Sequence, residues 1–363
     1  RAPYREYTYL LQDNAYGALE HLNSLTLGAP SAELAKDPTG LLEEIAHEYF
    51  HTWDLLRIRP AGAGDVTWRA PRPTSGLWVG EGFAMYYADL LLRRAGLPVK
   101  DSTRTDHLAR LMERYLARED GYTRYTAEQV SRAANTAPGN LGDYLLSTHL
   151  QGELLGALLD LRIRAATHEG RSLDDVMRRM MEDFSGATGF TDRDVETTAE
   201  AVCGCKLKAF FAAYVRGRKP IPFDQYLRLI GMHSEVSWAP ARNDSGAERP
   251  DLRIMAWMPP EAKHPSLVLF TPEGIWGKAG LHTGDQVLRV DGAPIVDAAA
   301  FRAALGRFAI GQPAQLAIER DGKTIGIRVV IRGYDAPGVT IVPNAHSTAD
   351  QRALRTAWLS GGQ

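Results

Sequence analysis

The sequence predicts a multi-domain α+β protein in which a mostly helical domain precedes a small β-rich domain. The chain has 363 residues, 44% of them hydrophobic, and at roughly 100–200 residues per domain this length suggests two or three domains. Apolar residues recur at helical spacing through most of 41–230, whereas short β-like runs follow residue 236. We therefore expect a helical domain at 1–235, a linker at 236–250, a β-rich domain at 251–333 and a C-terminal tail at 334–363.

The helical domain is expected to open with a short β region at 1–27, since residues 7–11 are rich in strand formers. A helix at 41–59 should end at Pro60, and the next should run from about Gly80 to Arg94. Further helices are expected at 103–118, 126–135, 143–168, 172–184, 191–203, 207–215 and 223–230. Capping boxes, formed by Ser172 with Asp175 and by Thr191 with Asp194, mark the start of two of them.

The β-rich domain is expected to contain strands at 267–270, 286–290, 315–320 and 325–331, and one helix at 297–305. Asp291-Gly292 and Asp321-Gly322 are typical of the turns between such strands. The absence of an internal sequence repeat excludes solenoid and propeller folds.

The charge balance argues against several classes of partner. The chain has 42 basic and 44 acidic residues and a net charge of −2, so nucleic acid or an anionic membrane is not expected as the main partner. No eighteen consecutive residues are apolar, which excludes a conventional transmembrane helix, and we expect a soluble protein. The sequence starts at Arg1 without a basic-then-apolar leader, and the compartment stays open between periplasmic or secreted and cytoplasmic.

Cys203 and Cys205 are the two cysteines of the sequence. A separation of two residues is poor geometry for a mutual disulfide, and two cysteines are too few for a disulfide scaffold or a cysteine zinc site. We expect two small, unbonded residues near a helix end.

The pattern His47-Glu48-Tyr49-Phe50-His51 lies inside the first long helix. Residues four apart project from one face, so both imidazoles can reach one metal ion. Zinc would lower the pKa of a water molecule there, and Glu48 could take its proton as general base. Alone, the pattern also fits two surface histidines with a salt-bridging glutamate.

Glu81 is the expected third ligand. It opens the next helix within WVGEGF at 78–83, and two histidines with one glutamate leave the open position of a catalytic zinc site. The alternative is an ordinary first-turn acid favoured by the helix dipole. The remaining histidines, His107 among them, lack ligand spacing and are expected on the surface or in loops.

A third motif lies upstream, at 16–24. By itself it predicts only a turn and a short strand. Such a strand, which includes Gly17 and Ala18, could lie along a cleft and pair with substrate backbone, and Glu20 could bind a free α-ammonium.

Three motifs resemble those of the glycyl aminopeptidase family: GALEH at 17–21, HEYFHTWDLLRIRP at 47–60 and WVGEGFAMYYADLLL at 78–92. Members of that family are zinc metallopeptidases of the gluzincin type with a PDZ domain near the C-terminus. The similarity continues through 156–164, 172–184, 214–223 and 351–359. It implies a thermolysin-like helical domain, one zinc ion held by His47, His51 and Glu81, Glu48 as catalytic acid/base, and Glu20 as an anchor for the substrate N-terminus.

This chain departs from the family pattern at several positions. Ala18 replaces a glycine, Leu22 an arginine and Asp54 an asparagine. Where the family has Tyr-Tyr-x-Lys-Gly, residues 148–152 read THLQG. The second tyrosine donates a hydrogen bond to the oxyanion, so the resemblance implies that role for His149, with Tyr144 as a substitute donor. The alternative for His149 is a solvated or packed helix histidine.

Residues 275–292 resemble bacterial PDZ modules, with AGLHTGD at 279–285. Such modules bind peptide C-termini by strand addition, with backbone amides around the carboxylate. We expect that loop near 252–254, where Arg253 stands at a position usually occupied by glycine. The alternative is a structural module packed on the catalytic domain.

Together these features predict a zinc metallopeptidase acting on peptides, an aminopeptidase that removes small N-terminal residues such as Gly or Ala. The alternatives are a zinc endopeptidase, or a catalytically weakened peptide-binding scaffold in which His149 has replaced the tyrosine. The N-terminal β-domain usual in the family is expected to be absent from this chain, or to be a separate chain, because GALEH lies so close to Arg1.

Overall fold

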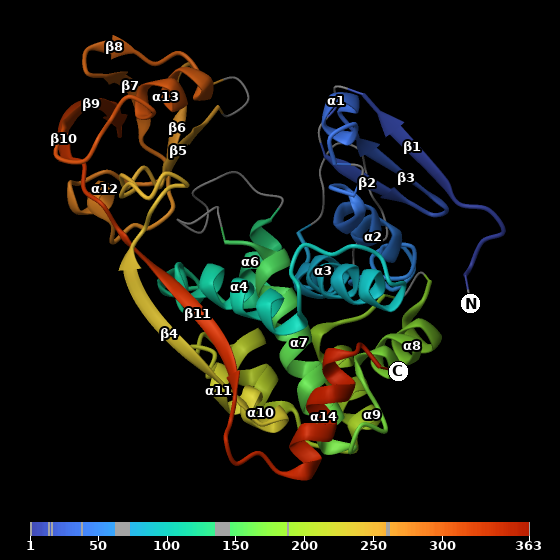
Figure 1. Ribbon diagram of the computed structural model, residues 1–363. Coiled ribbons are helices and arrows are strands. Elements are labelled where there is room, and N and C mark those ends of the chain that lie inside the picture. The colour runs from blue at the N-terminus through green and yellow to red at the C-terminus, as the bar shows by residue number, and fades with distance from the viewer. Residues whose placement is uncertain are drawn as a thin grey trace.

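The computed structural model describes residues 2–13, 15, 17–37, 39–61, 73–134, 146–186, 189–258 and 262–362. Figure 1 shows a small N-terminal sheet, a body of helices, and a β-rich module joined to that body by a two-stranded ribbon. The predicted fold class, a helical domain followed by a β-rich one, is confirmed. Within these ranges no helix has the length and apolar character needed to cross a membrane.

The N-terminal sheet has the order β1-β3-β2, with β1 (Thr8–Gln12) parallel and β2 (Ala18–His21) antiparallel to β3 (Ser24–Gly28). Leu25 and Leu27 of β3 are buried, and their partners on β2 are Glu20 and Ala18. Residues paired across neighbouring strands share a face of the sheet. Glu20 and Ala18 therefore lie on the buried face of the sheet. The short helix α1 (Ser31–Leu34) follows β3, and β2 and β3 contact α2 (Leu42–Phe50).

The helical body is built around two long helices, α3 (Leu77–Arg94) and α7 (Thr148–Ala166), which pack against each other. Leu154, Leu155 and Leu158 of α7 are fully buried in one apolar cluster. The surrounding elements are α4 (Arg104–Leu116), α5 (Glu119–Tyr122), α6 (Ala127–Ala133), α8 (Leu173–Phe184), α9 (Asp192–Cys203), α10 (Lys208–Phe210), the π-helix η1 (Phe211–Val215), α11 (Phe223–Leu227) and the 3-10 helix η2 (Arg228–Ile230). Both predicted capping boxes, at Ser172 and Thr191, are confirmed.

The helix expected at 41–59 is shorter than predicted. It ends at Phe50, after which Leu55 takes a positive φ of 79° and its N–H donates to the carbonyl of Ile58. This turn ends the helix before Pro60, although apolar spacing continues through the segment. The apolar spacing therefore predicts too long a helix, because the hydrogen bond from Leu55 to Ile58 closes a turn where the helix would otherwise continue.

Helices α3 and α7 cross at two glycines. A Cβ on Gly82 would lie 2.2 Å from Cα of Gly152, and a Cβ on Gly152 would lie 1.9 Å from the carbonyl oxygen of Trp78. The two backbones can approach this closely only where both residues lack a side chain. Glu81 precedes Gly82, and His149 lies one turn before Gly152, so this contact sets the spacing between two predicted site residues.

The β-rich module, residues 241–334, is inserted between two strands of the ribbon. Strands β4 (Met232–Pro240) and β11 (Asp335–Pro343) pair antiparallel along their whole length. The module's sheet has the order β10-β9-β7-β6-β5, with β8 paired to β7. Its elements are β5 (Ile254–Trp257), β6 (Ser266–Leu269), α12 (Ile275–Lys278), β7 (Gln286–Val290), β8 (Ala293–Pro294), α13 (Ala298–Leu305), β9 (Pro313–Arg320) and β10 (Lys323–Val330).

The residues after 334 form regular structure. After β11, helix α14 (Ala349–Leu359) returns to the helical body, where Trp358 and Leu354 join the apolar cluster. The segment expected as a linker, 236–250, begins within β4. The helical body is thus built from segments that precede the module in the sequence and from segments that follow it.

The module also contacts the helical body directly, next to α5. Arg118 donates to the carbonyl oxygen of Phe270 at 2.9 Å, and Arg124 forms an ion pair with Glu273. These contacts and the ribbon together hold the module against the body.

Cys203 and Cys205 form a disulfide, so the predicted pair of unbonded residues is wrong. Helix α9 ends at Cys203, and Gly204 adopts the left-handed conformation at φ 60°, which turns the chain back. The two Cα atoms are 5.1 Å apart, within the range that a disulfide bridges. In an extended chain residues two apart lie about 7 Å from each other, so the turn at Gly204 brings the two cysteines within bonding distance.

His107 on α4 is buried, contrary to the surface position expected for it. Its Nδ1 lies 2.9 Å from Asp101 Oδ2, and its Nε2 lies 2.7 Å from Glu153 Oε1. Burial lowers the pKa of His107, but the hydrogen bond and charge of Glu153 outweigh this effect and raise the pKa above its usual value. The charged histidine therefore links α4 to α7.

We expect Gly82→Ala to destabilise the protein by more than about 2 kcal/mol, because its methyl group would collide with the backbone of α7. Urea denaturation followed by far-UV circular dichroism measures the effect. Gly306→Ala is the matched control, since its Cβ would meet nothing closer than 3.6 Å, and we expect a change within about 0.5 kcal/mol. Equal stability of the two variants would contradict the close crossing.

We expect His107→Gln to destabilise the protein by at least about 2 kcal/mol at pH 6, because Glu153 loses its buried counter-ion. The folded-state pKa of His107 is raised. Its contribution is therefore fully present below the unfolded pKa of about 6.5 and is lost as the pH rises through the folded value. Urea denaturation at pH 6 and pH 9 should show the larger loss at pH 6. His346→Gln, at an exposed position, is the control, and a larger loss at pH 9 would refute the assignment.

Candidate metal centre and active site

Three side-chain atoms from two helices converge at the N-terminal end of α3. The Nε2 atoms of His47, on α2, and of His51, the residue that caps the C-terminus of this helix, lie 3.0 Å from each other. Each lies 3.5 Å from Oε2 of Glu81 on α3. Since all three donor atoms fall within 4.8 Å of one another, one metal ion could contact them together. The structure thus brings together the three residues expected as ligands.

The backbone orients one of these imidazoles. Nδ1 of His51 lies 3.3 Å from the carbonyl oxygen of Asp54. When Nδ1 donates its proton there, the lone pair of Nε2 faces the cluster. The carboxylate of Asp54 is fully buried, and within the described structure neither of its oxygens has a hydrogen-bond partner. Burial raises the pKa of Asp54 to about 8. The carbonyl of residue 54, rather than its side chain, therefore contacts the imidazole.

Glu48 lies beside the cluster with a free carboxylate oxygen. Glu48 is 6% exposed, and its Oε2 atom has no hydrogen-bond partner among the described residues. Burial raises the pKa of Glu48 to about 7, and the nearby carboxylates of Glu20 and Glu81 contribute to the rise. Burying a carboxyl group without a hydrogen-bond partner costs folding free energy, so this arrangement indicates that Glu48 interacts with a ligand or substrate.

The cluster favours a positive charge at its centre. Burial opposes ionisation of Glu81, but hydrogen bonds from His149, His47 and His51 hold its pKa well below the usual value. Burial lowers the pKa of His51, yet the carboxylate of Glu81 outweighs this and raises the pKa to about 9. Two nitrogen donors and one carboxylate oxygen, in a site that attracts positive charge, fit the ligand preference of zinc.

His149 joins the cluster from the first turn of α7. Its Nε2 lies 3.2 Å from Oε2 of Glu81, and its ring stacks on that of His47 with centroids 5.6 Å apart. The side chain is 48% exposed, so one side of it faces solvent. Tyr144, the other expected donor, lies outside the described residues.

The residues expected to bind substrate lie on one side of the same centre. Ala18 and Glu20 lie on the buried face of the N-terminal sheet, and Gly17 precedes them with φ 87°. β2 is an edge strand of that sheet, so its outer backbone groups are in a position to pair with an added strand. The charge of Glu20 contributes to the raised pKa values of both Glu48 and His51, which places it near the centre.

A cavity of about 330 Å³ opens at the centre, and we call it the catalytic cavity. Besides site residues predicted from the sequence, it is lined by three that were not: Glu43, Glu44 and Met85. Helical spacing could have identified all three, because Glu43 and Glu44 lie four and three residues before His47, and Met85 lies four residues after Glu81. Side chains at that spacing share one helix face with the ligand.

In the β-rich module, the loop expected to receive a peptide carboxylate is internally bonded. The guanidinium of Arg253 makes two hydrogen bonds of 2.9 Å to Asp251 and lies 4.1 Å from the ring centroid of Tyr334. The amide of Arg253 donates to Asp251 Oδ1 at 3.3 Å, and that of Ile254 to the carbonyl of Leu252 at 2.8 Å. These two amides already have acceptors.

Comparison with known proteins agrees with the motifs. Residues 40–155 match the model of the M61 glycyl aminopeptidase family, and residues 275–331 match the PDZ domain. The predicted resemblance to a peptidase with a C-terminal PDZ module is therefore confirmed. No curated protein matches the sequence.

One solved structure has a similar fold over nearly the whole chain, and two others match only part of it. An aminopeptidase N family protein from Idiomarina loihiensis has a TM-score of 0.67 and 20% sequence identity; the match covers 99% of this chain and 63% of that one. This chain thus spans less than two thirds of the length of that structure. The serine endoprotease from Yersinia pestis has a TM-score of 0.19 and 20% identity, over 22% of this chain and 30% of that one. The HtrA3 PDZ domain bound to a phage-derived ligand has a TM-score of 0.18 and 18% identity, over 30% and 92% of the two chains.

Proposed function

We propose that this protein is a zinc-dependent metallopeptidase, an aminopeptidase that removes small N-terminal residues such as Gly or Ala from peptides. The observation that carries the proposal is the convergence of His47, His51 and Glu81 beside the unpaired carboxyl group of Glu48. The match of residues 40–155 to the glycyl aminopeptidases supports it.

His47, His51 and Glu81 would hold the zinc ion through Nε2, Nε2 and Oε2. When bound, zinc supplies Lewis-acid polarisation of the scissile carbonyl and makes a water molecule acidic near neutral pH. Oε2 of Glu48 is free to accept the proton of the attacking water and to return it to the leaving amine. Glu48 thus serves as general base and then as general acid.

His149 supplies a hydrogen-bond donor on the side of the cavity formed by α7. Its Nε2 can donate to the carbonyl oxygen of the substrate as negative charge develops there, in exchange for its contact with Glu81. Tyr144 is proposed as an alternative donor. If neither His149 nor Tyr144 donates to the oxyanion, catalysis is weak and the protein serves instead as a peptide-binding scaffold. This is the second candidate function.

The N-terminal strand would position the substrate. β2, with Gly17 and Ala18, would pair with substrate backbone, and the carboxylate of Glu20 would bind the free α-ammonium. The methyl group of Ala18 lines the catalytic cavity and reduces the space for the first side chain, which favours Gly or Ala. In a zinc endopeptidase, by contrast, Glu20 would have no ammonium to bind.

The role of the PDZ module stays a proposal. It would bind a peptide C-terminus by strand addition at β5, an edge strand of its sheet. For this the loop before β5 would have to release the amides of Arg253 and Ile254 from their present acceptors. Otherwise the module is a structural one, packed on the helical body.

We expect Glu48→Gln to lower kcat/KM for alanine and glycine amides by about 10²–10⁴-fold, the usual contribution of a general base. The variant should retain one zinc ion per chain, measured by atomic emission, because it leaves the three ligands intact. His51→Ala is the complementary control, and we expect it to lose zinc and activity together. Equal activity of Glu48→Gln and the wild type would refute the enzymatic proposal.

We expect N-acetylation of a peptide substrate to lower kcat/KM by about 100-fold, since it removes the charge that pairs with Glu20. Glu20→Gln should slow hydrolysis of the free peptide and leave the acetylated peptide nearly unaffected. Rates are measured from released amine for both peptides and both proteins. Equal rates for free and acetylated peptides would establish an endopeptidase instead.

A further inference from the structure

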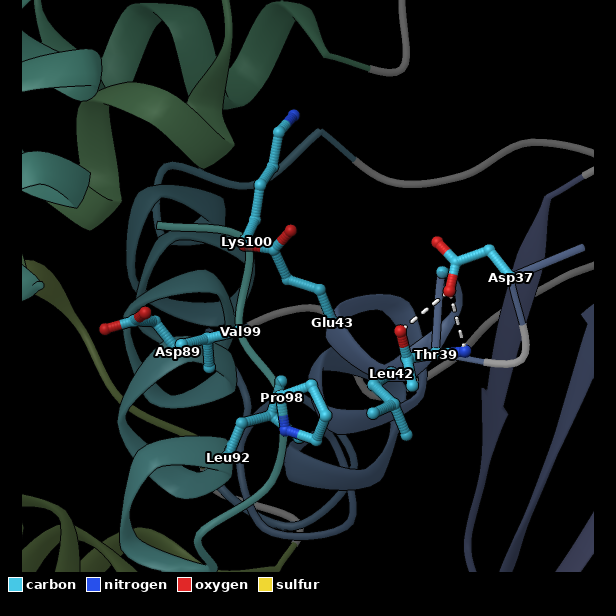
Figure 2. A pocket seen from close by; sticks show the side chains of 10 residues that line it. Asp37, Thr39, Leu42, Glu43, Asp89, Leu92, Pro98, Val99 and Lys100 are labelled. Carbon is cyan, nitrogen blue, oxygen red and sulfur yellow. Dashed lines mark hydrogen bonds between the residues drawn. The ribbon is translucent and has the colours of Figure 1, made fainter. Parts of the chain in front are cut away.

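A second cavity, of about 490 Å³, adjoins the catalytic cavity, and we call it the side cavity. Glu43 lines both cavities, so the two meet at this side chain. Figure 2 shows Glu43 on α2 between the loop that carries Asp37 and Thr39 and the segment that carries Lys100. A ligand in the catalytic cavity therefore has an adjacent space into which a side chain can extend.

The lining of the side cavity combines an apolar wall with carboxylates. The wall consists of Leu42, Leu92, Pro98 and Val99. Such a surface covers the methylene stem of a long side chain while its charged end stays in contact with polar groups. The carboxylates come from Asp37, Glu43 and Asp89.

The charges around the side cavity favour a cation. Asp89 is already paired, since both of its oxygens lie 2.9 Å from Nε of Arg93. Asp37 accepts hydrogen bonds from Thr39, which lower the pKa of Asp37 and keep it ionised.

Within the described structure Glu43 makes no hydrogen bond or ion pair, although its charge helps to raise the pKa of Arg110. Among the described residues that line the side cavity, Lys100 is the one basic side chain. Glu44 adds a further carboxylate to the lining of the catalytic cavity. Negative charge therefore predominates where the cavities meet.

A separate observation, in the catalytic cavity itself, points to a bound ligand next to the side cavity. Glu48, 6% exposed, lines it with an unpaired carboxylate oxygen. The catalytic cavity is also lined by Ala18 of β2, whereas no residue of β2 lines the side cavity. If β2 and Glu20 hold the amino-terminal residue, the side cavity lies on the side of the residue that follows it.

From this arrangement we infer that the side cavity is a specificity subsite for a basic side chain, Arg or Lys, on the residue that follows the scissile bond, with Glu43 as its recognition residue. This inference rests on the proposed peptidase function and narrows its substrate class. The preferred substrates are peptides with a small N-terminal residue followed by a basic one. The stem of the basic side chain packs on Leu92, Pro98 and Val99, and its charged end pairs with Glu43.

The test measures peptide binding without turnover. In zinc-loaded Glu48→Gln protein, calorimetry compares the peptides Ala-Arg-Ala and Ala-Leu-Ala. We expect the arginine peptide to bind about tenfold more tightly. Adding Glu43→Gln should reduce that preference to about threefold or less, and adding Lys100→Met should increase it, because Lys100 repels the same cation. Glu33→Gln, on α1 and outside the lining of both cavities, is the matched control and should leave the ratio unchanged.

Equal affinity for the two peptides, or a preference that Glu43→Gln leaves intact, overturns the inference. Its failure is distinguishable from failure of the proposed function, which is read from hydrolysis of Ala-Leu-Ala by the wild type and its loss in Glu48→Gln. In the wild type, the ratio of kcat/KM for the two peptides should follow the affinity ratio and should fall as salt is added. A ratio independent of salt would contradict recognition by charge.

Discussion

The backbone contact between Gly82 and Gly152 is the constraint on which the candidate site depends. Glu81 directly precedes Gly82 in the chain, and His149 lies one helical turn before Gly152. A methyl group at either position would overlap the facing backbone, and helices held apart at a more usual distance of 8–10 Å would move the two side chains away from each other. The 3.2 Å separation of Glu81 Oε2 and His149 Nε2 is therefore a consequence of helix packing.

The helical body places this contact in a rigid surrounding. α7 is buried over most of its length, and α14, which follows β11 in the chain, packs Trp358 into the same cluster. Figure 1 shows how the ribbon of β4 and β11 leaves the body and comes back to it. Because ligands must be held within fractions of an ångström to act, a site built on packed helices is better defined than one built on loops.

The electrostatics of the centre support the proposed metal-dependent hydrolysis. Carboxylates from α2, α3 and β2 surround two imidazoles, and a cation at the centre would relieve their mutual repulsion. Glu43 extends this group of carboxylates to the side cavity, which Asp37 also lines. Net charge of the whole chain, at −2, conceals this local concentration. The proposed chemistry and the inferred preference for basic substrates thus follow from one local distribution of charge.

Much of the site could be predicted because its signals are local in sequence. His47, Glu48 and His51 fall within one helical turn and a half, and a helix of fixed period places the two imidazoles on one face whatever the rest of the fold does. Glu81 was predicted from a second helix start and from resemblance to a family. The disulfide was missed because one left-handed residue, Gly204, shortens the distance between the cysteines, and backbone conformation at a single residue leaves little pattern in a sequence.

The sequence by itself determined the fold class, the order of the domains and the identity of the residues expected at the metal centre, because periodicity and motif spacing are short-range properties of the chain. The tertiary structure alone decided that His149 reaches Glu81, that His107 is a buried bridge, that α14 belongs to the helical body and that Glu43 connects two cavities. These features join residues from 46 to hundreds of positions apart, such as His107 and Glu153 or Arg104 and Trp358. Only the packing of whole helices brings such residues into contact, and no local pattern records it.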